Sequence, residues 1–378
     1  MMRVIFLFFF LLAFATCSVA QEGMEHGKYS SQSDGYLEEP LPQGWNAGEF
    51  FDQTLPPDDT WWLNFEDSLL DSLILTACKN NYSALGAMEN IRKARAAWRK
   101  TQGALMPSFD LNFGWQRDKT SGNSPQTLYR EAWEGQYSAA VSMKWQADVF
   151  GTIYMRSKAQ KKLFMATEEE FNAVMVSLVA NVAITYFSLR QSLAEMQVIR
   201  WNVESQREIM EIVTSRYKSG LASKLDVAQS LSVYYSTKAK IPAMQASIDG
   251  YRNAMAVLLG VYPQELDGWL EEGYALPEYM APIEVGLPAH LLLRRPDVRA
   301  AQRQVEANAV LLGATRRDWF PSLFLTGTLG FTSDKLKTLP RSKSLVWEIA
   351  PSLQWSIFGG MDRVNATREA RAALDASI

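Results

Sequence analysis

The sequence predicts a membrane α/β protein in which several chains each contribute four β-strands to one barrel, with long helices forming a tube beneath it. Three features of the 378-residue chain lead to this fold class. Four segments alternate polar and apolar residues, one long run lacks both Pro and Gly, and the same order of segments occurs twice. The chain is 47% hydrophobic and holds 38 basic against 41 acidic residues, which argues against a uniform polyanion-binding surface and so against nucleic acid as a partner, while a local charged patch stays open.

Residues 1–20 are predicted to be a secretory signal peptide. Arg3 precedes an apolar run from Val4 to Phe14, and small residues lead to a cleavage point after Ala20. The run is too short to cross a bilayer as a permanent helix. Cys17 leaves open an alternative, in which a lipid is attached at this residue. Residues 21–60 are polar and rich in Gly, Pro and acids, which predicts a flexible or surface-wrapping arm.

Helical spacing dominates the chain after residue 60. Apolar residues three or four apart predict helices over Asp67–Lys79 and Ser83–Ala104. The run without Pro or Gly predicts one helix from Thr152 to about Tyr217, on the order of 100 Å long. No globular core has that length, so coiled-coil packing with partner helices is expected along it.

A helical hairpin should follow, because Gly220 is placed to end the long helix. A second helix is predicted from about Ser223 to Leu259, interrupted at Pro242, so the tip of the hairpin lies near Gly220. Further along, Pro296 is expected at a first helical position, and the charged residues around it are assigned to fixing that helix start.

Strands are predicted at about 108–118, 136–149, 322–332 and 346–357, where apolar and polar residues alternate. These segments are longer than soluble strands usually are, and they match strands tilted through a bilayer with one row facing lipid. The residues predicted to face lipid in the first two segments are Phe109, Leu111, Phe113, Trp115, Val141, Met143 and Trp145. The charged residues assigned to the opposite rows are Asp110, Asp118, Lys144 and Asp148. Their mixed signs predict no ion selectivity. Two amphipathic hairpins covering a soluble core are the alternative.

The order helix, Pro-Ser, strand, loop, strand, Phe-Gly, helix occurs twice, which indicates a duplicated unit. Pro107-Ser108 corresponds to Pro321-Ser322, and Phe150-Gly151 corresponds to Phe358-Gly359. Four strands cannot close a barrel, and open sheet edges in lipid would leave backbone groups without hydrogen bonds. Several chains are therefore predicted to share one barrel.

Composition gives little support for catalysis. The chain has two Cys and two His, and His26 and His290 are far apart, so a His-based metal site is not expected. The sequence has no Gly-rich phosphate loop, paired-His helix or Ser nucleophile elbow. We therefore predict a protein that is not an enzyme and has no metal or cofactor. Cys78, on a predicted helix, is expected to be a small buried residue.

Together these features resemble the TolC-like outer-membrane efflux channel family, the exit ducts of tripartite multidrug efflux pumps. The resemblance is carried by Leu-Met-Pro-Ser at 105–108 and Trp-Phe-Pro-Ser at 319–322, and by Trp-Gln-Ala-Asp-Val-Phe-Gly at 145–151. It is also carried by Arg-Arg-Pro-Asp-Val-Arg-Ala-Ala at 294–301, typical of the multidrug branch. The last motif is Arg-Tyr-Lys-Ser-Gly-Leu at 216–221, followed by Leu-Asp-Val at 225–227. Taken together, the resemblance covers residues 61–378.

The resemblance implies a homotrimer in the cell outer membrane, with a helical tunnel in the periplasm. Drugs or other small molecules would leave passively, driven by an inner-membrane transporter through a periplasmic adaptor protein. Gly220 and Leu221 match the tip residues that dock the adaptor, and Asp226 matches an Asp that holds the tip closed. The alternative for Asp226 is a capping or solvated acid near a helix start.

The resemblance also divides the chain into a first repeat at 61–285 and an incomplete second repeat at 286–378. Ile378 falls inside what would be the second repeat's long helix, so we expect a truncated gene, a fragment or an incomplete record. A secreted, soluble coiled-coil adaptor or scaffold is the alternative function. It explains the hairpin but not the four strands.

Overall fold

The computed structural model describes residues 51–52, 60–119, 133–266, 277–279, 283–284 and 294–378. The predicted signal peptide, Cys17 and nearly all of the polar arm lie outside the described residues. The chain divides into two compact units. The first contains residues 94–165 and 301–378, and the second contains residues 41–93 and 166–300. Each unit is described by itself.

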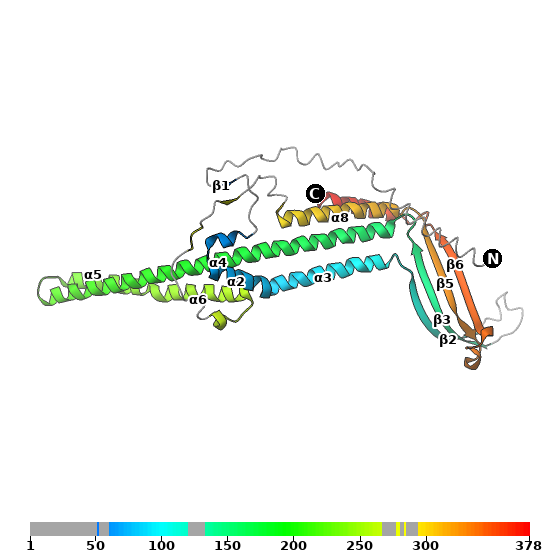
Figure 1. The fold of residues 1–378 in the computed structure, drawn as a ribbon, viewed down its shortest axis with the longest axis horizontal. Helices are drawn as coiled ribbons and strands as arrows, with labels where there is room; N and C mark the ends of the chain where they lie inside the picture. The colour runs from blue at the N-terminus through cyan, green and yellow to red at the C-terminus, as the bar shows by residue number, and fades with distance from the viewer. Residues whose placement is uncertain (1–50, 53–59, 120–132, 267–276, 280–282, 285–293) are drawn as a thin grey trace. The chain divides into compact units, whose positions relative to one another are not determined.

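The first unit contains a four-stranded antiparallel sheet in the order β2-β3-β5-β6 (Figure 1). The strands are β2 (Ser108–Lys119), β3 (Trp133–Ala147), β5 (Ser322–Ser333) and β6 (Leu345–Gln354). All four predicted strands are confirmed, with different ends. The fourth was predicted to reach residue 357 but stops at 354, because the next residue turns its indole toward the carbonyl of Trp319.

The duplicated unit is confirmed by matching elements. Two helices of 22 residues, α3 (Tyr82–Gly103) and α8 (Pro296–Arg317), each lead into a pair of strands. Each pair is followed by another helix, α4 (Thr152–Lys218) or α9 (Asp362–Asp375). Pro296 is the first residue of α8 as predicted, and Arg295 pairs with Asp297 beside it at 2.7 Å.

The second unit packs α2 (Ser68–Asn80) and α6 (Lys240–Leu259) against the part of α4 beyond residue 166. The fully buried residues that carry this core, each at most 2% exposed, are Leu70, Leu73, Ile74, Ala77, Val182, Ala183, Tyr186, Leu189, Ile248, Met255, Ala256 and Leu259. On α4 they recur three or four residues apart, as the amphipathic spacing requires. Cys78 packs half-buried beside this core, and burial raises the pKa of its thiol.

Buried polar contacts fix the ends of these helices. The Asn81 side chain accepts from the backbone N–H of Ser83 and Ala84 and donates to the Leu258 carbonyl at 2.9 Å. Gly260 follows α6 with a φ of 66°. A Cβ on it would lie 2.6 Å from the carbonyl oxygen of Asn80, so a larger residue would push the helix ends apart.

α4 is one uninterrupted helix of 67 residues, on the order of 100 Å long. It includes an 18-residue stretch of mean hydropathy 1.6, apolar enough to cross a membrane by length and composition alone. Core helices of soluble proteins satisfy the same test, and in this chain Val182 and Tyr186 of α4 are buried against the second unit's core. The stretch is therefore weak evidence for a membrane helix.

The return helix breaks at a different place from the predicted one. It consists of α5 (Lys224–Lys238) and α6, which meet at Ala239. Pro242 was expected to cause the interruption, but it lies within the first turn of α6. A helix tolerates Pro there because the first-turn N–H groups have no partner inside the helix.

Candidate functional site

The register of the sheet places the predicted apolar rows on one face. Leu111 lies opposite Val141, Val141 opposite Leu329, and Leu329 opposite Trp347, so one apolar row crosses all four strands. These side chains are 64%, 42%, 59% and 66% exposed in that order. Residues directly opposite in an antiparallel pair point to the same side, so this face is a continuous exposed apolar surface.

The next row along the sheet is polar from edge to edge. Asp110 pairs with Ser142, Ser142 with Thr328, and Thr328 with Glu348, so these residues share the opposite face. On that face the Asn112 amide donates to the Ser142 hydroxyl at 3.0 Å. The sheet therefore has one apolar and one polar face, with both faces open to the surroundings in the single chain.

The residues predicted to face lipid lie together on the apolar face. Phe109, Leu111, Phe113, Trp115 and Val141 are exposed there. Met143 and Trp145 belong to the same face and are half-buried. The prediction that this face meets lipid remains a prediction.

Asp148 was assigned to the polar row of the second strand, and this was wrong. The strand ends at Ala147, and the Asp148 carboxylate accepts from the backbone N–H of Ile153 and Tyr154 at 3.1 and 2.7 Å. It therefore satisfies free donors in the first turn of α4, where a negative charge also suits the helix dipole. The side chain of Asp118 lies outside the described residues.

Both repeats use the same tryptophan bond where helix gives way to strand. The indole N–H of Trp145 donates to the Leu105 carbonyl at 2.9 Å, and that of Trp355 donates to the Trp319 carbonyl at 3.1 Å. Leu105 and Trp319 occupy matching places, two residues before the proline of each Pro-Ser pair. The sequence showed the repeated tryptophans but not their partners, because the bond joins residues about 40 positions apart in the chain.

A pocket of about 310 Å³ lies at this junction, between the strand ends and the helices of the first unit. It is lined by arginines and aspartates in equal number, among them Arg156 and Asp318, which form an ion pair at 2.7 Å. The balanced charge gives the pocket no preference for anions or cations.

The helical tip is held by backbone bonds around Gly220. The N–H of Gly220 donates to the Tyr217 carbonyl at 2.9 Å, and that of Leu221 donates to the Arg216 carbonyl at 2.8 Å. This is the Schellman pattern, and the φ of 75° at Gly220 is the left-handed conformation it requires. A Cβ on Gly220 would meet nothing within 4 Å, and Leu221 is 71% exposed. The tip is thus rigid in its backbone and open on its surface.

Asp226 starts the return helix at this tip. Its Oδ2 accepts from the Ser223 N–H and hydroxyl, each at 2.8 Å, and its own N–H donates to Ser223 Oγ at 3.1 Å. This reciprocal arrangement is a capping box. The Ser223 backbone and hydroxyl bonds lower the pKa of the Asp226 carboxyl, with a smaller contribution from Arg216. Capping therefore accounts for this Asp at least in part, while the predicted closing role is untested.

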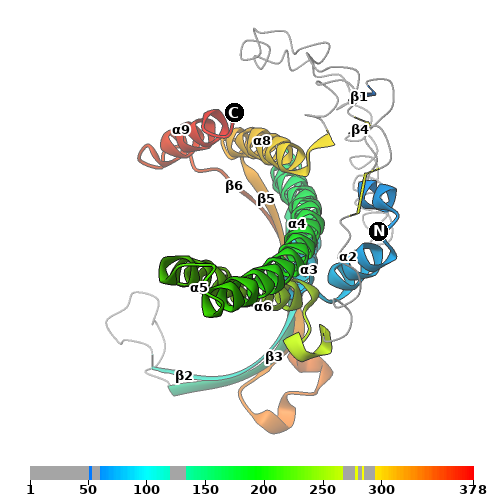
Figure 2. The same cartoon turned by 90° about the vertical axis from the view of Figure 1, so that its left-hand side faces the viewer.

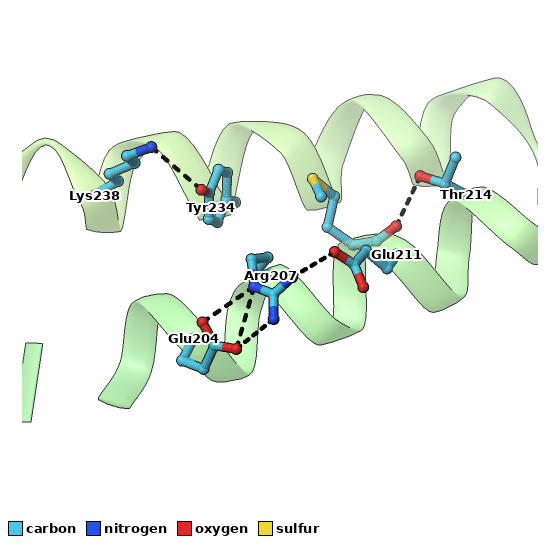
Figure 3. Close-up of polar contacts among 7 residues, drawn as sticks. Glu204, Arg207, Glu211, Thr214, Tyr234 and Lys238 are labelled. Atoms are coloured by element: carbon cyan, nitrogen blue, oxygen red, sulfur yellow. Dashed lines mark hydrogen bonds and ion pairs between the residues drawn. The ribbon is translucent and has the colours of Figure 1, made fainter. Parts of the chain in front are cut away.

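Above the tip, α4 and α5 run beside each other, as both views show (Figures 1 and 2). Figure 3 shows Arg207 bonded to Glu204 one turn before it and to Glu211 one turn after it, the latter at 2.8 Å. The hydrogen bond from Arg207 lowers the pKa of Glu204. These pairs are exposed and follow one helix, so they support helicity and do not form a site.

A buried polar cluster in the second unit was not predicted. The Tyr186 hydroxyl donates to Asp67 Oδ2, and the Arg190 Nε–H donates to the same hydroxyl at 2.9 Å. Asp67 Oδ1 accepts from the first N–H groups of α2 and so caps that helix. Burial, followed by the bond to Asp67, raises the pKa of Tyr186 to about 12. The cluster ties the start of α2 to α4, so its role is structural.

Among the described residues, no group of three or more His, Cys, Asp or Glu is placed to hold a metal ion. What the described chain offers is a two-faced sheet with unpaired edges and a capped helical tip. Both features suit contacts with other molecules.

Comparison with known proteins identifies relatives that are named as components of efflux systems. The chain is 29% identical over 350 residues to the probable efflux pump outer membrane protein SepC of Pseudomonas putida, a match that covers 88% of this chain and 72% of SepC. It is 28% identical over 307 residues to the cation efflux system protein CusC of Escherichia coli, covering 81% of this chain and 65% of CusC.

Solved structures agree with the fold. The outer-membrane channel OprN matches with a TM-score of 0.83 at 27% identity, covering 90% of this chain and 76% of that one. A structure of CusC matches with a TM-score of 0.76 at 25% identity, covering 89% and 77%. These proteins are outer-membrane proteins, so the alternative of a soluble secreted adaptor is not supported. Residues 73–261 and 287–378 match the family model of outer membrane efflux proteins, and the chain belongs to that family.

Proposed function

We propose that this chain is one protomer of the exit duct of a tripartite efflux pump. The chain is an outer-membrane protein with its helical part in the periplasm. Its role is to let small molecules leave passively after an inner-membrane transporter and a periplasmic adaptor deliver them. The observation that carries the proposal is the continuous apolar face of a sheet whose outer strands, β2 and β6, are unpaired among the described residues.

The unpaired edges support a shared barrel. β2 and β6 are 12 and 10 residues long, and in a bilayer each would leave a row of backbone N–H and C=O groups without partners. Pairing β2 of one chain with β6 of the next removes every edge once the ring closes. We infer a homotrimer, the assembly that the family resemblance implies.

Exposed apolar residues on α4 support the same assembly. Val176, Ile184 and Trp201 are 59%, 62% and 66% exposed in the single chain. A helix on the order of 100 Å long with apolar residues open to water is expected to have neighbours along it. Helices of adjacent copies would supply them and enclose a tunnel.

The tip is the part of the hairpin proposed to meet the adaptor. Gly220 and Leu221 lie on a backbone fixed by two hydrogen bonds, with open space over the glycine and an exposed leucine next to it. A rigid, apolar and accessible tip is suited to docking, because little conformational entropy is lost when it binds. Asp226 is proposed to hold the tip closed through its carboxylate.

The transported molecules are proposed to be drugs or other small compounds, without selection by charge. The polar face of the sheet carries Asp110, Lys144 and Glu348, which are of both signs. Relatives are named for toluene efflux and for cation efflux, so the family serves different substrates.

Export from living cells tests the proposal. The chain is expressed with its pump and adaptor in a strain without such channels, and loss of preloaded ethidium is followed with and without an energy source. We expect energised efflux that stops when the chain is omitted. A chain that folds in the outer membrane but gives the same efflux rate as the empty strain would contradict the duct function.

A further inference from the structure

We propose that the β5–β6 loop, residues 334–344, binds phosphate groups of the lipid in the outer leaflet. The inference rests on the proposed function, which places the loop on the cell exterior. It adds a lipid-binding site to a chain otherwise described as a duct.

The loop is folded. It contains the 3-10 turns η4 (Leu336–Thr338) and η5 (Ser342–Ser344). Thr338 is the centre of its bonding: its hydroxyl donates to the Lys335 carbonyl at 2.9 Å, and its carbonyl accepts from the Ser344 hydroxyl at 2.8 Å. The Ser333 hydroxyl bonds to the Thr338 hydroxyl at the base of the loop. Side chains on this backbone are presented from defined positions, which lowers the entropy lost on binding.

The charge of the loop is strongly positive. Lys335, Lys337, Arg341 and Lys343 are exposed, and the only acid within the loop is Asp334. In the described part of the chain none of these four cations forms an ion pair. Four cations without an ion pair, against one acid, favour a polyanionic partner.

The position of the loop selects the kind of anion. It joins the strand ends that lie away from α8 and the other helices of the first unit (Figure 1). The last apolar pairs of the sheet before the loop are Phe331 with Leu345 and Leu329 with Trp347. The cations therefore follow directly on the apolar face, at the level where a lipid places its headgroup. Phosphates on the outer-leaflet lipid are the anions available there.

Binding of lipid A, a bis-phosphorylated lipid, to the purified protein tests this. Fluorescent lipid A is titrated in dodecyl maltoside micelles against the wild type and against the variant K335Q/K337Q/R341Q/K343Q. The matched control, K79Q/K93Q/R99Q/K100Q, removes the same charges from exposed positions on α2 and α3. One cation near an anionic lipid surface changes affinity about fivefold at low salt, so the loop variant should bind at least about tenfold more weakly. The control should bind as the wild type does, and salt should weaken the wild type's binding.

Two further experiments distinguish failure of the lipid-binding inference from failure of the proposed function. Lipid A stripped of its phosphates should bind wild type and loop variant equally, since only the acyl chains remain to be recognised. Equal binding of intact lipid A by the loop variant and the wild type would overturn the inference. Labelling of S342C, in a C78A background, by a membrane-impermeant maleimide on intact cells reports the loop's side of the membrane. Absence of labelling in folded protein would contradict the proposed topology, and therefore the proposed function as well.

Discussion

Asp226 has a structural and a proposed functional task, and a change at Ser223 allows them to be separated. Oδ2 takes both bonds from Ser223, so the capping box depends on Ser223 as much as on the Asp. S223A should lower the unfolding free energy by about 1 kcal/mol, as other cap losses do, and leave the tip closed. D226A should remove the same box together with the charge and raise passive uptake of antibiotics. Equal uptake in the two variants would assign Asp226 to capping alone.

Gly220 gives a second test at the level of single residues. Asn is the side chain that best tolerates a left-handed backbone, so G220N should keep the turn and export. G220W should fold with a modest loss, of about 1 kcal/mol, because nothing in the chain lies within 4 Å of its Cβ. Its bulk would project from the tip, so export and crosslinking to the adaptor should fall sharply. Unchanged crosslinking in folded G220W would limit Gly220 to its role as a turn.

Tyr186 is expected to make the free energy of unfolding depend on pH. Its pKa is raised to about 12 in the folded chain, above the ordinary value of 10.0, so folding favours the protonated hydroxyl. That stabilisation is complete below pH 10 and is lost as pH rises toward 12. Y186F should lower the unfolding free energy by about 1–3 kcal/mol at neutral pH, since the buried Arg190 and the half-buried Asp67 each lose a partner. Denaturant unfolding followed by circular dichroism should also show a flatter decline for Y186F above pH 10.

At the scale of elements, substitutions of neighbouring residues on the two faces of β3 are expected to affect assembly differently. Val141 belongs to the apolar row that crosses all four strands, and Ser142 belongs to the polar row beside it. V141R should cost about 2–4 kcal/mol near the bilayer midplane and reduce assembled protein in outer-membrane fractions. S142R should assemble close to wild-type levels. Comparable losses from both variants would show that the apolar face does not meet lipid.

Elements were predictable where the pattern is local. Alternation located β2 and β5 to within a residue, and the absence of Pro and Gly located α4, because both signals lie within the element itself. Alternation assigns a residue to one of two sides but does not identify its partner, so the row from Leu111 to Trp347 needed the register. The bond between Tyr186 and Asp67 joins residues 119 positions apart, and no local pattern indicates it.

The end of β3 was misplaced for a related reason, because a contact with the next element overrides the local pattern. Asp148 continued the alternation of its strand, and its true partners are backbone groups of the following helix. Helix capping overrides a strand pattern at this point, because unpaired N–H groups in a first turn need an acceptor. For the candidate site, Gly220 followed from turn chemistry and capping was one of the alternatives for Asp226, whereas its reciprocal bonds with Ser223 depend on the geometry of the turn.

At the scale of the whole molecule, the expected state is a trimer. Each chain supplies four strands, and only a closed ring leaves no edge in the lipid. The protein extracted in a mild detergent should have the protein mass of three chains by light scattering. The K335Q/K337Q/R341Q/K343Q variant serves as a control, because its changes lie outside the strands and should not alter that mass. A monomer that keeps its β-structure in detergent would exclude the shared barrel.

The rows that run unbroken from β2 to β6 also restrict how the sequence can change in length. Side chains alternate with a period of two. One inserted residue in β3 would therefore move each later side chain of that strand from the apolar face to the polar face, or the reverse. Leu329 and its neighbours on β5 would then face polar side chains from β3. Two inserted residues would preserve the sidedness and only lengthen the strand. Length changes within these strands should therefore be tolerated in even steps, a restriction that does not apply to the β5–β6 loop, where no alternation of faces has to be kept.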